Sequence, residues 1–179
     1  MHSLAVMLRN QVTLIKMKIF LKFKPWQLFT IWIITSIIFF ITMRTMFWWI
    51  TFELYAFSIV GWMYSIGKYF NKLNDKKAIV NYGEDIWFIL YLICGIPFGY
   101  YFANFGHDTS NDLILKISGL IGFVSMIRLA NFSAKAYKQY NNNKDLKFSD
   151  YLEEFIWITI FIVGIWRIQP EINKIIDKK

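Results

Sequence analysis

The sequence predicts an all-α membrane protein, a bundle of four transmembrane helices with a short fifth apolar helix. Of its 179 residues, 56% are hydrophobic and only 18% are charged, whereas soluble domains average roughly 45–50% and about 25%. The apolar residues form long runs, and a chain of this length is too short to shield four such helices from water. The Lys and Arg residues gather on alternate connections between the runs, as in membrane proteins.

Five apolar runs can be traced along the chain, at residues 26–43, 46–67, 86–105, 113–130 and 155–168. A helix needs about 20 residues, within a range of about 17–25, to cross a hydrocarbon core about 30 Å thick. The first three runs reach this length with at most one formal charge each. The fourth reaches it if Lys116 and Arg128 extend towards the two interfaces.

The fifth run is short, because a helix over residues 155–168 rises only about 21 Å. It is predicted to be re-entrant, to lie along the interface, or to cross. We favour four full crossings, since a fifth would place the basic end of the chain outside. Residues 26–168 are then the transmembrane helical domain, with a basic cytoplasmic segment at residues 1–25 and a basic tail at residues 169–179.

The basic residues predict how the chain is oriented. They precede the first run and fill the connections after the second and fourth runs, at Arg9, Lys16, Lys18, Lys22, Lys24, Lys68, Lys72, Lys76, Lys77, Lys135, Lys138, Lys144 and Lys147. The other two connections hold only Arg44, so the N-terminus and both basic connections are predicted to be cytoplasmic. The net charge of +8 then meets the anionic head groups of the bilayer, and no nucleic acid partner is expected.

Charges inside the apolar runs are costly in lipid, which makes them candidate functional residues. Glu53 lies seven residues past the outer start of the second run, and Lys116 lies three residues into the fourth. Both fall in the outer half of the bilayer, so an intramembrane pair between them is geometrically possible. Arg44, in the outer connection, is a second candidate partner for Glu53. Such a pair either fixes the register of the helices or forms a proton or ion site.

Small residues recur at helix-packing spacing in the third and fourth runs, at Gly95, Gly99, Ala103, Ser118 and Gly122. Small faces let helix backbones approach closely. Pro97, inside the GxxxG pattern, leaves a backbone carbonyl unpaired and should kink its helix. These positions predict close packing within the bundle or in a homo-oligomer, or a hinge at Pro97.

Recognisable catalytic and metal-binding patterns are missing from the sequence. It contains no HExxH, CxxC, GxSxG or phosphate-binding glycine loop. Its histidines, His2 and His107, are too few for a metal site, and the single cysteine, Cys94, is expected to be a small buried hydrophobe. We therefore predict no catalytic residue, no metal and no cofactor, and do not expect an enzyme.

The favoured function is that of a non-catalytic membrane protein that acts through helix–helix association with itself or a partner. The alternative is an oligomeric channel, a pore-forming effector or a small transporter subunit. Glu53, Lys116 and Pro97 would then border a pathway, together with Thr35, Ser36 and Asn104. A third hypothesis, an intramembrane enzyme, has no candidate residue.

Four stretches carry a resemblance to a known group of proteins: KFKPWQLF (residues 22–29), GWMYSIGKYFNK (61–72), FSDYLEEF (148–155) and GIWRIQPEIN (164–173). They resemble a group of uncharacterised small multi-pass membrane proteins of Bacteroidetes-type bacteria. That group often has a proline just before Gly-Ile-Trp, where this chain has Val163. The resemblance implies a protein of the bacterial inner membrane, but it carries no activity, so it assigns no functional residue.

Overall fold

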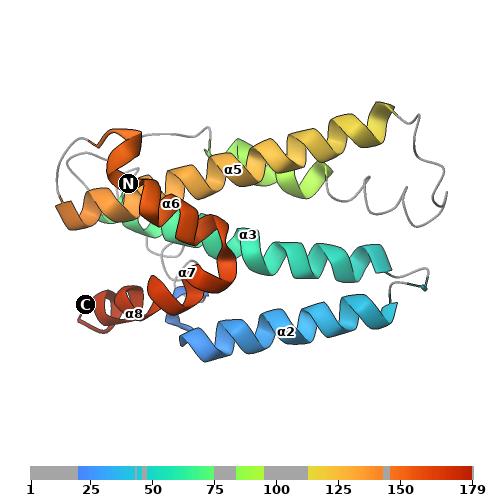
Figure 1. The fold of residues 1–179 in the computed structure, drawn as a ribbon, viewed down its shortest axis with the longest axis horizontal. Helices are drawn as coiled ribbons and strands as arrows, with labels where there is room; N and C mark the ends of the chain where they lie inside the picture. The colour runs from blue at the N-terminus through green and yellow to red at the C-terminus, as the bar shows by residue number, and fades with distance from the viewer. Residues whose placement is uncertain are drawn as a thin grey trace, which may run out of the picture.

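The chain folds as a set of packed helices. The computed structural model describes residues 20–42, 44–45, 48–74, 84–94, 113–142 and 146–178, and every regular element in these ranges is helical. Three long helices lie side by side, with α3 between the other two (Figure 1): α2 (Pro25–Thr42), α3 (Trp48–Leu73) and α5 (Leu113–Asn142). Residues 84–94 are also helical. The predicted all-α fold is therefore confirmed for the described part of the chain.

Four short elements complete the described structure after α5. They are the 3-10 helix η1 (Phe148–Tyr151), α6 (Leu152–Thr159), α7 (Phe161–Arg167) and α8 (Gln169–Asp177). α6 packs on α5, while α7 reaches α2 on the other side of α3. Residues 169–179, predicted to be a basic tail, thus include a helix, and its Ile172 and Ile176 are buried.

Two of the described helices are long and apolar enough to cross a membrane. They are Pro25–Thr42, with a mean hydropathy of 1.6, and the segment Lys116–Asn142 of α5, with a mean hydropathy of 1.4. α3 is long enough but its mean hydropathy is too low, because its sequence includes Glu53 and several Trp, Tyr and Ser residues. Its central position between α2 and α5 accounts for this difference, since a central helix shows less of its surface to the surroundings.

The first long helix, α2, satisfies its polar side chains internally. Its hydroxyl groups donate to backbone carbonyls one turn earlier, as Thr30 does to Trp26 (2.8 Å) and Ser36 to Trp32 (2.7 Å). Pro25 suits the first turn because its fixed φ matches a helix and its missing N–H is not needed there. Only 6% of α2 is buried in the chain, so nearly every side chain of this apolar helix is exposed or half-buried.

The buried core lies at one end of the bundle, where the second half of α3 meets the second half of α5. A Cβ at Gly67 would come within 2.4 Å of the Phe132 ring, so the missing side chain lets the two helices approach. Ser133 donates a hydrogen bond across this contact to the Met63 carbonyl at 2.6 Å. The predicted fourth run ended at residue 130, whereas α5 continues to Asn142 because its polar second half packs against α3.

The fifth apolar run, predicted as one short helix, is divided in two. α6 ends at Thr159, and Ile160 has a non-helical backbone (φ −86°, ψ 78°) before α7 begins. The chain turns at this point and α7 returns, so that α8 lies at the same end of the bundle as the start of α2 (Figure 1). Gly164 permits the turn, because a Cβ there would lie 2.6 Å from the Trp157 carbonyl oxygen and 2.9 Å from the Trp62 ring.

Replacing Gly164 with Ala should therefore destabilise this fold-back. The new methyl group would press on a backbone carbonyl, and overpacking of this kind costs about 1–3 kcal/mol. The matched control is Gly122→Ala on α5, where a Cβ meets no atom within 4 Å. The thermal unfolding midpoint of the purified protein should fall in the first variant and hold or rise in the second. Equal midpoints would contradict the close contact at Gly164.

Candidate functional site

The predicted intramembrane charges lie on α3, on α5 and in the connection before α3. Glu53 on α3 is half-buried, and its Oε1 atom has no hydrogen-bond partner. Lys116 and Arg44 are both exposed. Among the described residues, neither forms an ion pair with Glu53. The Glu53–Lys116 pair, with Arg44 as its alternative, therefore stays a prediction.

The small-residue positions divide into two groups. Gly95, Pro97, Gly99 and Ala103 lie outside the described residues. Ser118 on α5 is buried, but Gly122 on the same helix faces open space, since a Cβ built there meets no atom within 4 Å. Gly122 therefore makes no close helix contact with the described part of the chain.

The open space beside Gly122 is a cavity of about 230 Å³. It lies between α3, the helix at residues 84–94 and α5, and it is lined by Phe52, Tyr91, Cys94, Ser118, Gly119, Gly122, Phe123 and Met126. The lining carries no charge and is mostly apolar. Cys94, expected to be a buried hydrophobe, is partly exposed and borders this cavity.

A charge cluster joins the same three segments nearer the core. Asp85 forms an ion pair with Lys68 and accepts a hydrogen bond from the Tyr64 hydroxyl, both at 2.5 Å. Arg128 of α5 lies over the Trp87 ring, 5.7 Å from its centre. Burial raises the pKa of Glu84, although the positive charges of Arg128 and Lys68 oppose this. Sequence reasoning missed the cluster because its members come from α3, from residues 84–94 and from α5, which are far apart in the sequence.

The most completely satisfied polar group is the side-chain amide of Gln169 at the start of α8. This side chain is 0% exposed. Its Oε1 accepts a hydrogen bond from Trp62 Nε1 at 2.8 Å, and its Nε2 donates to the carbonyls of Leu21 (2.8 Å) and Phe23 (2.9 Å). Asn173, one turn later, accepts from the same Nε2 and donates to the Phe23 carbonyl. α8 is thereby fixed to α3 and to the segment before α2.

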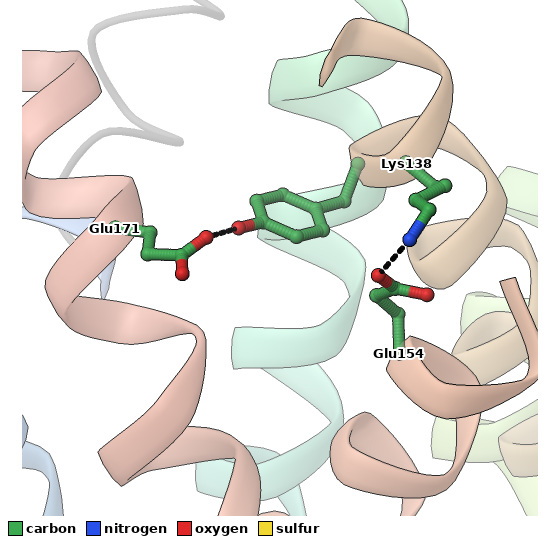
Figure 2. A network of polar contacts seen from close by, with 4 residues as sticks. Lys138, Glu154 and Glu171 are labelled. Carbon is green, nitrogen blue, oxygen red and sulfur yellow. Dashed lines mark hydrogen bonds and ion pairs between the residues drawn. The ribbon is translucent and has the colours of Figure 1, made fainter. Parts of the chain in front are cut away.

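Two further contacts tie α5 to the short helices (Figure 2). Lys138 of α5 pairs with the buried Glu154 of α6 at 2.6 Å. The Tyr137 hydroxyl donates to the Glu171 carboxylate of α8. Both acids are therefore engaged in holding the helices together.

The ion pairs and hydrogen bonds described above hold helices to one another. No group of three His, Cys, Asp or Glu side chains that could hold a metal is found in the described ranges. Cys94 borders the apolar cavity, whose lining as described contains no histidine. No protein-family model matches the chain, and no curated protein or solved structure is significantly similar to it.

Replacing Gln169 with Leu should strongly destabilise the protein. Leucine would leave the Trp62 N–H and the Leu21 and Phe23 carbonyls buried without this partner, at a cost of about 1–3 kcal/mol for each group left unsatisfied. Chemical or thermal unfolding of the purified protein measures the loss.

Gln139→Leu is the matched control for this substitution. Gln139 is also buried, at 5% exposed, but its Oε1 has no hydrogen-bond partner. Its removal should cost little. A Gln169 variant as stable as the Gln139 variant would show that the buried amide does not hold the helices.

Proposed function

We propose that this chain is a non-catalytic multi-pass protein of the bacterial inner membrane that acts through helix–helix association with itself or a partner. The supporting observation is the surface of α2. This helix combines a mean hydropathy of 1.6 with only 6% burial, and its exposed large apolar side chains are Trp26, Ile33, Ile34, Ile37, Ile38, Phe40 and Ile41. Monomeric soluble proteins rarely expose contiguous apolar surfaces of this kind, and such surfaces mark contacts with membranes or proteins.

Four crossings account best for the described helices. They are α2, the first part of α3, the third apolar run, which begins at Ile86, and the first part of α5. The α6–α7 pair would dip into the lipid and return, because Ile156, Ile160, Ile162, Val163 and Trp166 are exposed around its turn. Of the three arrangements predicted for the fifth run, this proposal adopts the re-entrant one.

The distribution of charge supports a cytoplasmic location for the end of the bundle that carries α8. Lys22, Lys24 and Lys72 lie at this end, and the returning chain brings Lys174 and Lys178 of the C-terminal segment to it (Figure 1). The positive-inside rule is then obeyed by both ends of the chain. These lysines would meet the anionic head groups of the inner leaflet.

Topology reporters test this arrangement. Fused after residue 179, a reporter that functions only in the cytoplasm should be active. Inserted in the connection at residues 106–112, a reporter that functions only outside the cytoplasm should be active. The charge asymmetry is the reason for this expectation. An external C-terminus would contradict the re-entrant pair and indicate five crossings.

Association through α2 is the mode of action that its exposed face favours. The exposed positions recur along one side of the helix, as in Ile34, Ile37 and Ile41, while Leu28 on the other side is 3% exposed. Within lipid, helices associate by packing and hydrogen bonding, because lipid chains are as apolar as the side chains. A second copy supplies a matching apolar helix without any further component.

Single-cysteine variants in a Cys94→Ala background test association. Ile37→Cys should form a disulfide between copies under mild oxidation in membranes, whereas Leu28→Cys, which faces its own chain, should not. Gel mobility with and without reductant measures the product. Monomer only would contradict association through α2. Solute flux through liposomes that Glu53→Gln abolishes would favour the alternative of a channel, pore-forming effector or transporter subunit.

A further inference from the structure

The cavity between α3, residues 84–94 and α5 is large enough to be a binding site. Protein interiors contain few voids larger than a water molecule, and an apolar cavity of about 150 Å³ already binds benzene. The volume here is about 230 Å³. It persists because Gly119 and Gly122 present no side chain to it, and a Cβ at Gly122 would still meet no neighbour within 4 Å.

The chemistry of the lining selects an apolar occupant. Phe52, Phe123 and Met126 provide most of the large side chains around the space, and no charged residue borders it. A polar solute would lose its hydrogen bonds with water on entering such a space and would find few replacements. An apolar chain has no hydrogen bonds with water to lose.

The position of the cavity indicates where that occupant comes from. Phe123 lines the cavity and is 59% exposed, so the space opens on the outer surface of α5. Leu120, one turn before Phe123, is 62% exposed. On the adjacent helix, Ile93, which directly precedes Cys94, is 56% exposed. The cavity is thus continuous with the surface that the proposed function assigns to lipid, and a lipid chain can enter it without passing through water.

Charge complementarity agrees with this direction of entry. Lys116 lies one turn before Gly119 and Leu120 on α5, on the side of the outer connection. Lys116 is exposed near the start of α5, so the proposed membrane placement puts this residue at the level of the outer head groups. A phospholipid with its phosphate at that level would have its acyl chains beside the cavity mouth.

We propose that this cavity binds one acyl chain of a bilayer phospholipid. The inference rests on the proposed membrane placement and adds a defined lipid site to it.

Photolabelling of the full-length protein in liposomes tests the site. The probe is a phosphatidylglycerol with a diazirine in the middle of one acyl chain, and mass spectrometry locates the label. We expect label on the lining residues Phe123 and Met126 and also on Ile160 and Ile162 at the exposed α6–α7 turn, which report general contact with lipid. Gly122→Leu fills the open space, so label on the lining residues should fall about tenfold, equivalent to about 1.4 kcal/mol of binding, while label at the α6–α7 turn stays unchanged.

Val124→Leu is the matched control, because Val124 lies on the same helix, is 37% exposed and does not line the cavity. It should leave both labels unchanged. Cys94, the only cysteine of the chain, allows the same test without a substitution. A hexyl group attached to its sulfur through a disulfide should block labelling of the lining, and a reductant should restore it.

The results separate the two proposals. Lining label that is equal in wild type and Gly122→Leu, or label at the α6–α7 turn with none in the cavity, would overturn the lipid site and leave the membrane placement intact. Crosslinks between copies at Cys94 with an unlabelled lining would overturn the lipid site in favour of a second copy as the occupant. Absence of label at the α6–α7 turn as well would overturn the membrane placement itself.

Discussion

The fully buried amide of Gln169 is the contact on which the arrangement of the C-terminal helices depends. It joins three parts of the chain that are far apart in the sequence: the segment before α2, the middle of α3 and the start of α8. A buried amide is stabilising only where its donors and acceptor all find partners. Burial of the Gln169 amide is therefore favourable only when all three segments are in place. The chain meets this condition by turning back at Ile160.

The two ends of the bundle are consequently held by different forces. At the end with α8, hydrogen bonds and ion pairs accompany a dense core that contains Trp62, Ile66 and Phe70. At the other end, the described parts of α2, α3 and α5 show exposed residues such as Ile41, Leu54 and Leu120. Directional polar contacts specify one geometry, whereas in the proposed membrane placement apolar contacts would give little preference between protein and lipid neighbours. On that proposal, the second end is where a lipid chain or another helix would replace a contact within the chain.

The sequence was most informative where length and composition decide the structure. The apolar runs located α2, α3 and the beginning of α5, because a long uncharged segment has few alternatives to a helix. The sequence was uninformative where a contact between distant segments determines where a helix ends or breaks. The continuation of α5 to Asn142 depends on packing against α3, and the break at Ile160 depends on Gly164 lying against α6. Gln169 lies in a segment whose basic charge predicts a tail. The residues next to it in the sequence do not indicate its hydrogen-bond partners, which lie far away in the chain.

Glycine shows most clearly why a pattern of small residues does not settle what those residues do. Gly67 and Gly164 lack a side chain because another segment occupies that space within 3 Å. Gly122 lacks one beside an empty volume. In a helix interior glycine is destabilising by roughly 0.5–1 kcal/mol relative to alanine, and the close contacts at Gly67 and Gly164 offset that cost. At Gly122 no contact of a built Cβ with the described chain offsets that cost, and the acyl chain that we propose for the cavity would supply the missing contact.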